Sequence, residues 1–173
     1  MAEEKEYTVL PEAKEIIKSL VERYPKILWT VRPELIEVLG VVNKERPKSS
    51  KKMATIRKVA GATKALLEHN RIPIEYIVEL FCSDWQPMSP QKREWLLFHE
   101  VLHIPGPDEK GLIDHDTKDY SLILDAAGLN WWDRDDLPLL STGDLVPFKE
   151  ELAVKLHKKD GDDPDVPEGT PEA

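Results

Sequence analysis

One helix, marked by proline at both ends, constrains the fold of this chain more than any other segment. It follows Ser89-Pro90, reads QKREWLLFHEVLH, and stops at Ile104-Pro105. Serine caps free backbone N–H groups and proline fits the first helical turn, so Ser-Pro is a typical helix start. The second proline disfavours helical backbone at the residue before it, and the predicted helix therefore ends at Ile104.

Apolar side chains surround this helix on almost every side. They are Trp95, Leu96, Leu97, Phe98, Val101, Leu102 and Ile104. A helix that is apolar all round is buried, so we expect it to run through the core. Its polar residues His99, Glu100 and His103 would then also be buried, and buried imidazoles and carboxylates are costly unless they are paired or bind a metal.

The spacing of these polar residues is that of a zinc site. His99 and His103 are four residues apart, which places both imidazoles on one face of the helix, about one turn apart. The pattern H-E-x-x-H supplies two zinc ligands and a glutamate that can act as general base on a zinc-activated water. In the plainer alternative, both histidines are core residues satisfied by hydrogen bonds and Glu100 forms an ion pair.

A catalytic zinc takes three protein ligands and keeps one open position, and His115 is the best candidate for the third ligand. It follows His103 across the turn PGPDEKG, which can reverse the chain. We expect it in the first turn of a helix over 115–127, with Asp114 as N-cap and Gly128 directly after the helix end. A helix packed antiparallel to the zinc helix would bring this imidazole to the metal.

The sequence leaves some ligand sets open and excludes others. The alternatives to His115 are Asp114, Asp116 and Asp119. Asp116 or Asp119 could instead hold a ligand histidine through its free ring N–H. Metzincins carry a glycine and a third histidine soon after the second one, and IPGPDEKG contains no histidine. Gluzincins use a glutamate on a downstream helix, and residues 115–127 contain none.

The remaining hydrophobic patterns predict an α+β fold. Apolar residues at helical spacing predict helices over 11–24 and 144–158. Runs rich in branched residues predict strands over 34–43 and 72–82. Residues 53–68 are ambiguous, because a glycine interrupts their helical spacing. We expect helices packed against a small sheet.

The formal net charge of −9 is spread unevenly along the chain. Residues 160–173 hold six acids and no base, with three prolines and one large aliphatic residue, so they cannot bury enough apolar surface to offset the entropy of ordering. We expect one domain over 1–158 and a disordered acidic tail over 159–173. The segment Lys44–Lys64 has eight basic residues against one acidic residue. It could bind nucleic acid by neutralising phosphates, or it could be a solvated loop, since it has no aromatic residue to stack on bases.

Other sequence features indicate the cellular compartment. No run of about 18 apolar residues could span a membrane, and no signal-peptide stretch is present. The single cysteine, Cys82, rules out an internal disulfide framework and suits a reducing compartment. We expect a cytoplasmic protein without a membrane partner.

The segments IEYIVELFCSDWQPMSPQKREWLLFHEVLHIPG and GLIDHDTKDYSLILDAAGLNW resemble the family of putative phage metallopeptidases, minimal zincins related in motif to the SprT-like zinc peptidases. The resemblance covers residues 34–132. It rests on Ser89, Gln91 to Arg93, Leu96, His99, Glu100, His103, Ile104, Pro105, His115, Asp116, Gly128, Leu129 and Trp131. It implies a minimal zincin-like fold, in which a small sheet packs on the H-E-x-x-H helix and a following helix, within the domain 1–158. In zincins the substrate commonly lies along an edge strand, and 72–82 is the candidate for that strand.

The resemblance also implies zinc-dependent hydrolysis of a peptide or protein substrate. Zinc held by His99, His103 and His115 would activate a water, and Glu100 would take its proton as general base and pass it to the leaving amine. One alternative is a zinc-binding regulatory protein on a peptidase scaffold with little turnover; the intact Glu100 argues against it, because a structural zinc needs no base. Another is a nucleic-acid-associated protein that uses Lys44–Lys64.

Overall fold

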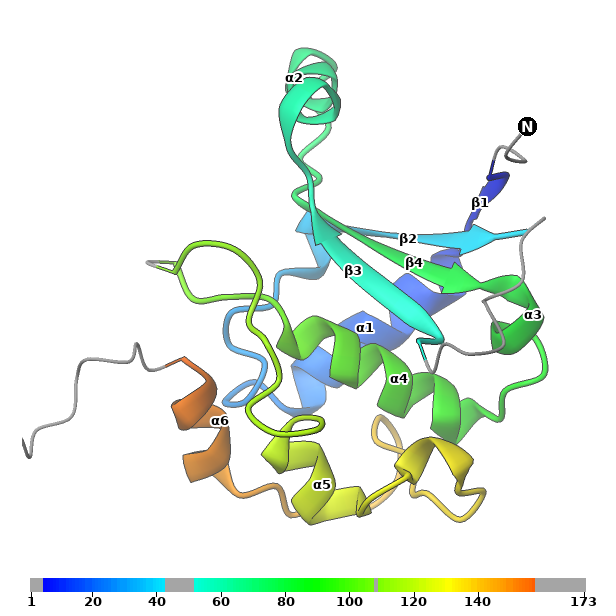
Figure 1. Ribbon diagram of the computed structural model, residues 1–173, viewed down its shortest axis with the longest axis vertical. Coiled ribbons are helices and arrows are strands. Elements are labelled where there is room, and N and C mark those ends of the chain that lie inside the picture. The colour runs from blue at the N-terminus through cyan, green and yellow to red at the C-terminus, as the bar shows by residue number, and fades with distance from the viewer. Residues whose placement is uncertain (1–4, 43–51, 108, 158–173) are drawn as a thin grey trace, which may run out of the picture.

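The computed structural model describes residues 5–42, 52–107 and 109–157, and it confirms the α+β fold (Figure 1). In chain order the elements are β1 (Tyr7–Val9), α1 (Pro11–Arg23), the 3₁₀ helix η1 (Pro33–Leu35), β2 (Ile36–Val41), β3 (Ala54–Lys58), α2 (Gly61–His69), β4 (Tyr76–Phe81), α3 (Cys82–Trp85), α4 (Pro90–Leu102), α5 (Ser121–Ala127), the 3₁₀ helix η2 (Trp131–Asp133) and α6 (Glu150–Leu156). The helix predicted over 11–24 and the strands predicted over 34–43 and 72–82 are thus present with shifted ends.

The four strands form one mixed sheet in the order β1-β2-β4-β3. β2 and β4 are parallel, and the two outer pairs are antiparallel. Alternate side chains of the three longer strands are buried on one face: Ile36 and Val38 of β2, Val78 and Leu80 of β4, and Ala54 and Ile56 of β3. On the opposite face Glu79 forms ion pairs with Lys5 and Arg57. The sheet therefore has one apolar face that helices can cover and one charged face.

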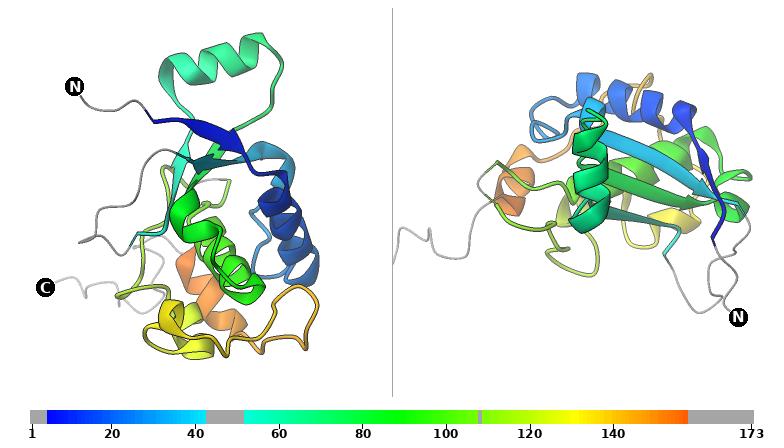
Figure 2. Two further views of the ribbon diagram at one scale, coloured as in Figure 1. Left: turned by 90° about the vertical axis from the view of Figure 1, so that its right-hand side faces the viewer. Right: turned by 90° about the horizontal axis from the view of Figure 1, so that it is seen from above.

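Helices α1 and α4 pack against the apolar face and against each other (Figure 2). The start of α4 follows the prediction, because the Ser89 hydroxyl accepts a hydrogen bond from the backbone N–H of Lys92 and Pro90 is the first helical residue. The helix ends at Leu102, with His103 as C-cap. The seven apolar residues predicted to surround it are at most 4% exposed. The zinc-motif helix thus runs through the core, as predicted.

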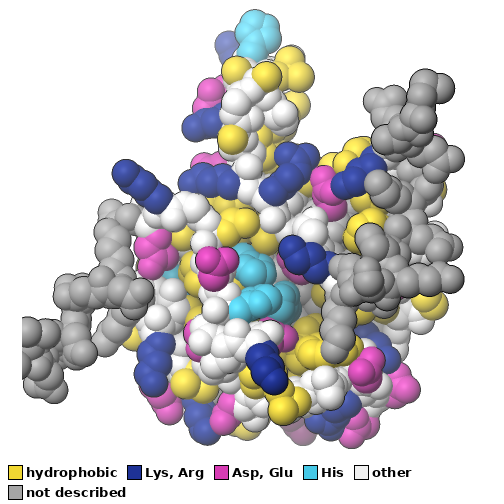
Figure 3. All heavy atoms as spheres, in the orientation of Figure 1, with side chains coloured by type: hydrophobic (Ala, Val, Ile, Leu, Met, Phe, Trp, Pro, Cys, Tyr) yellow, Lys and Arg dark blue, Asp and Glu magenta, His cyan; other side chains and the backbone are white. Residues whose placement is uncertain are grey.

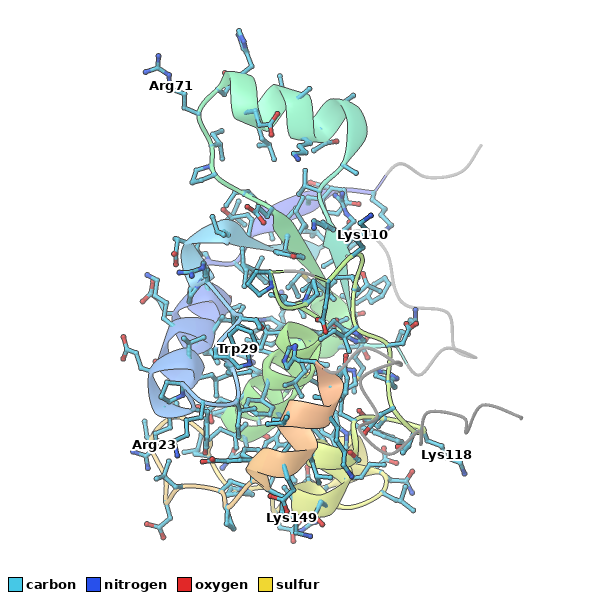
Figure 4. All side chains as sticks on the ribbon, turned by 90° about the vertical axis from the view of Figure 1, so that its left-hand side faces the viewer. Arg23, Trp29, Arg71, Lys110, Lys118 and Lys149 are labelled. Atoms are coloured by element: carbon cyan, nitrogen blue, oxygen red, sulfur yellow. The ribbon has the colours of Figure 1, made fainter. Side chains whose placement is uncertain are left out.

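The ambiguous segment 53–68 forms two elements rather than one. β3 ends at Lys58, and α2 begins at Gly61, whose φ of +56° favours glycine. α2 projects beyond the sheet, and all its residues except Leu67 are exposed (Figure 1). Arg71, just after α2, points away from the rest of the molecule (Figure 4). The glycine that interrupts the sequence pattern therefore marks the boundary between a strand and a projecting helix.

Two predicted helices each begin six residues later than the sequence pattern indicates. α5 begins at Ser121, because the carboxylate of Asp116 accepts a hydrogen bond from the backbone N–H of Ser121 and caps the helix there. The prediction of Asp114 as N-cap is therefore wrong, and the residues before α5 are irregular. α6 begins at Glu150, and Pro147 disfavours helical backbone at Val146, within the first part of the predicted helix.

Some predictions concern residues outside the described ranges. The acidic tail predicted over 159–173 lies outside the described residues. Residues 44–51 of the basic segment Lys44–Lys64 also lie outside them. The single domain over 1–158, the nucleic-acid partner and the peptide partner stay predictions. Within the described part of the chain, no helix is both long and apolar enough to cross a membrane.

Candidate metal centre

The three histidines predicted as zinc ligands lie together on one face of the molecule. α4 contributes His99 and His103, and the irregular loop before α5 contributes His115. The centroids of the three imidazole rings are 4.9–5.4 Å apart, and one ring nitrogen of each lies within 4.8 Å of the others. Figure 3 shows histidine side chains in a hollow near the centre of this face. The fold thus brings His115 to the pair on α4 from a loop, not from the helical turn predicted for it.

Asp119 contacts His99 on the side away from the other histidines. Its Oδ1 lies 2.9 Å from Nδ1 of His99, with imperfect alignment of the ring N–H. The same carboxylate accepts hydrogen bonds from the Trp131 indole N–H at 2.8 Å and from the backbone N–H of Tyr120 at 2.7 Å. Burial raises the pKa of Asp119, but the contacts with His99 and Trp131 outweigh it and lower this pKa below the ordinary value. Because Asp119 contacts Nδ1 of His99, the other ring nitrogen, Nε2, is directed toward His115, and its distance to Nε2 of His115 is 3.1 Å.

Two neutral oxygens hold His103 in a similar way. Its Nδ1 lies 2.6 Å from the carbonyl oxygen of Ile113 and 2.7 Å from the hydroxyl oxygen of Tyr120. Burial lowers the pKa of His103 to about 4, and burial also lowers the pKa of His115. Both imidazoles are therefore neutral at pH 7, which is the form that binds metal ions.

Glu100 lies beside the histidines and is only 5% exposed. Burial raises its pKa to about 7, although the nearby His99 acts in the opposite direction. The backbone of Ile56 in β3 donates a hydrogen bond to this carboxylate. Glu100 is thus tied to the sheet, and its pKa lies where a carboxylate can both accept and release a proton at neutral pH.

A cavity of about 540 Å³ lies over the histidines and Glu100. β3 contributes one side of its lining, including Ala54, and the apolar side chains of Leu96, Trp131 and Trp132 contribute another. A concave site with mostly apolar walls and a few convergent polar groups is typical of ligand binding. The polar groups here include the histidines and Glu100, and the lining also contains charged side chains, among them Asp114 and Lys118.

The strand beside this cavity is β3, and the prediction that 72–82 is the edge strand is wrong. That segment forms β4, which lies between β2 and β3 inside the sheet. The dense apolar pattern of 72–82 reflects this interior position. Backbone hydrogen bonds of Met53 and Val59 point toward the β4 side. Because bonded and free positions alternate along an antiparallel edge strand, the backbone groups of the even-numbered residues, such as Ile56, face the open edge.

The side chains at this site fit a zinc ion. Three imidazoles form a known ligand set of catalytic zinc, and these three meet at the wall of the cavity. Two nitrogens bound to tetrahedral zinc are about 3.4 Å apart, close to the 3.1 Å between Nε2 of His99 and Nε2 of His115. The oxygens beside Nδ1 of His99 and of His103 leave Nε2 of each ring available, as expected for metal-binding histidines.

The two aspartates proposed as supports have different surroundings. Asp119 contacts His99, whereas Asp116 binds the backbone N–H and the hydroxyl of Ser121 at the start of α5. Sequence reasoning missed the carbonyl of Ile113, because every residue carries one and no motif marks it. The role of Trp131 could have been inferred, since a buried indole N–H needs an acceptor and an aspartate lies twelve residues before it.

A family model described as "Putative phage metallopeptidase" matches residues 5–137. The match includes all four strands, α4 and α5, and with them the three histidines and Glu100. No curated protein and no solved structure matches the chain significantly.

Proposed function

The chain belongs to the putative phage metallopeptidase family, and we propose that it is a zinc-dependent peptidase that uses Glu100 as its general base. The observation that carries the proposal is the arrangement of three histidines and Glu100 around one cavity. Three imidazoles that converge in this way leave a metal ion one open position. A structural zinc site would be closed by a fourth ligand and would have no use for a buried carboxylate beside it.

The proposed chemistry divides between the metal and the protein. When the three histidines bind it, zinc supplies Lewis-acid activation of a water molecule. The carboxylate of Glu100 accepts a proton from that water as its oxygen attacks the peptide carbonyl, and passes the proton to the leaving amine nitrogen. The pKa of Glu100, raised by burial to about 7, suits both transfers. The hydrogen bond from Ile56 keeps the carboxylate at the cavity wall.

In the proposed complex, an extended peptide adds to the open edge of β3. Ala54 and Lys58 present backbone N–H and C=O groups at this edge, by the alternation of bonded and free positions. The N–H of Ile56 is already used by Glu100, which leaves its carbonyl for the substrate. The apolar lining at Leu96 and Trp132 would receive a substrate side chain.

Replacement of Glu100 by glutamine tests the proposal. We expect the variant to keep the zinc content of the wild type and to lose hydrolysis of a denatured protein substrate by a factor of about 10²–10⁴, the usual contribution of a general base. The matched control is Glu94→Gln. Glu94 is another buried glutamate of α4, but it accepts hydrogen bonds from Leu140 and Ser141 and does not line the cavity. This control should keep both zinc and hydrolysis.

Each outcome discriminates between functions. Retained hydrolysis in the Glu100→Gln variant would exclude Glu100 as the base, and a wild-type protein that takes up no zinc would overturn the proposal as a whole. A wild-type protein that binds zinc and cleaves no peptide would instead favour a zinc-binding regulatory protein.

A further inference from the structure

Tyr120 contacts the candidate ligands from the protein side rather than from the cavity. Its side chain is completely buried, and it is the N-cap residue of α5, directly after Asp119. Its ring lies 4.9–5.5 Å, between centroids, from the rings of all three histidines. It is not among the described residues that line the cavity over them. Tyr120 is therefore placed to act on the histidines and not on a substrate.

Three atoms form a closed triangle behind His103. Nδ1 of His103 lies 2.6 Å from the carbonyl oxygen of Ile113 and 2.7 Å from the hydroxyl oxygen of Tyr120. The Tyr120 hydroxyl donates to the same carbonyl at 2.9 Å. A carbonyl oxygen can only accept, so Nδ1 must carry a proton to bond with it. The hydroxyl cannot donate to a protonated nitrogen, and its own proton therefore goes to the Ile113 carbonyl.

We propose that Tyr120 is a positioning residue for His103, which fixes this imidazole as the Nδ1–H tautomer with Nε2 free for a metal. The hydroxyl places a second oxygen beside Nδ1 and, by donating to Ile113, keeps the carbonyl aimed at the ring. A metal-binding histidine needs its other ring nitrogen held in this manner. The inference rests on the proposed function only in taking the bound group to be a metal.

The segment that carries Tyr120 supports both histidines of α4. Asp119 contacts Nδ1 of His99, and the next residue contacts Nδ1 of His103. The backbone N–H of Tyr120 also donates to the carboxylate of Asp119 at 2.7 Å, so the two supports are joined. Two consecutive residues at the start of α5 thus set the orientation of both rings.

The substitution Tyr120→Phe tests this role, because it removes one oxygen and keeps the buried ring. We expect zinc affinity, measured by competition with a coloured chelator, to fall about 10-fold, the lower end of the range for losing a partner of a metal-binding histidine. The carbonyl of Ile113 remains as an acceptor, which limits the loss. In the metal-free protein, ¹⁵N NMR of His103 should show a smaller fraction of the Nδ1–H tautomer.

The matched control is Tyr24→Phe. Tyr24 is 6% exposed, and its hydroxyl accepts a hydrogen bond from the backbone N–H of Val146 at 3.3 Å, without contact to a histidine. Unchanged zinc affinity or an unchanged His103 tautomer in Tyr120→Phe would overturn the proposal, as would an equal loss of affinity in Tyr24→Phe. If the wild-type chain itself takes up no zinc, the proposed function fails as well; if it binds zinc and Tyr120→Phe binds equally tightly, only the role of Tyr120 fails.

Discussion

The helix and the loop that supply the candidate ligands hold their histidines to different degrees. His99 and His103 lie on the buried α4, and Nδ1 of each contacts an oxygen from a neighbouring segment. His115 is exposed on the loop before α5, and within the described ranges no hydrogen bond to its Nδ1 is found. The helix thus provides a pair of candidate ligands whose rings are already oriented by contacts at Nδ1, and the loop provides a third candidate without such a contact.

This difference suits a site that must both bind an ion tightly and admit it. Rings that are already oriented lose little freedom when a metal binds, which favours affinity. A ligand on an exposed loop leaves the ion a path into the site, which a closed cage of buried side chains would lack. We infer that α4 supplies most of the metal affinity and that His115 completes the site.

The largest effect on zinc affinity should appear when a single imidazole is removed, either from α4 or from the loop before α5. We expect His103→Ala to lower zinc affinity by at least about 3 kcal/mol, roughly a hundredfold, which is a single ligand's share of a typical zinc binding energy. His115→Ala should lower zinc affinity by less, because no contact at Nδ1 orients this exposed imidazole in advance, so it loses more conformational freedom when it binds. Chelator competition, with elemental analysis of the purified proteins, measures both.

A reversed order of these two losses would contradict the comparison between helix and loop. If His115→Ala bound zinc as tightly as the wild type, the third ligand would be elsewhere, and Asp114, which also lines the cavity, would be the next residue to replace. The thermal unfolding temperature of each metal-free variant serves as the control, since a variant that does not fold reports nothing about affinity.

The same contrast explains which parts of the site could be predicted from sequence. The pair on α4 follows from local rules: Ser89 and Pro90 start the helix, and a spacing of four fixes the relation of His99 to His103. The conformation of the loop that carries His115 does not follow from local rules. α5 starts at Ser121, where the Asp116 carboxylate accepts a hydrogen bond from the backbone N–H, and helical periodicity in the sequence does not reveal that bond.

The edge strand shows the same limit for the sheet. A dense apolar run predicts a buried strand but does not show which strands flank it, and only the family resemblance suggests 72–82 as the edge strand, a position that β3 occupies. β1 was missed altogether, because it is only three residues long, too short to establish a period of two, and all three residues are exposed. Strand order depends on pairing between distant segments, which no short window of sequence contains.

The buried Glu100 on α4 should also lower the free energy of unfolding, whereas the exposed His115 on the loop should not. The folded state raises the pKa of Glu100 from 4.5 to about 7 by burial, so ionising this group in the folded protein costs free energy at any pH above its unfolded value, with the full cost reached above pH 7. We therefore expect Glu100→Gln to stabilise the metal-free protein by about 3 kcal/mol at pH 8 and by less than about 1 kcal/mol at pH 5. Urea unfolding at the two pH values measures the difference.

His115→Gln is the control for this experiment. His115 is exposed and neutral at pH 8 in both the folded and the unfolded chain, so its replacement should change the free energy of unfolding there by much less. A Glu100→Gln variant that is less stable than the wild type at pH 8 would mean that the carboxylate is stabilised by its surroundings, and the contrast in cost between helix and loop would be wrong.

A smaller effect should distinguish the roles of Asp116 and Asp119, the two aspartates before α5 that were proposed as supports. Asp119→Asn keeps the size of the side chain but removes the charge beside Nδ1 of His99, so zinc affinity should fall about 10- to 100-fold. Asp116→Asn weakens the cap at Ser121 instead, and should lower the free energy of unfolding by about 1 kcal/mol while zinc affinity stays near the wild-type value. Chelator competition and urea unfolding on both variants distinguish these effects. If Asp116→Asn weakened zinc binding more than Asp119→Asn, the helix cap at Ser121, and not the contact of Asp119 with His99, would control the orientation of the candidate ligands.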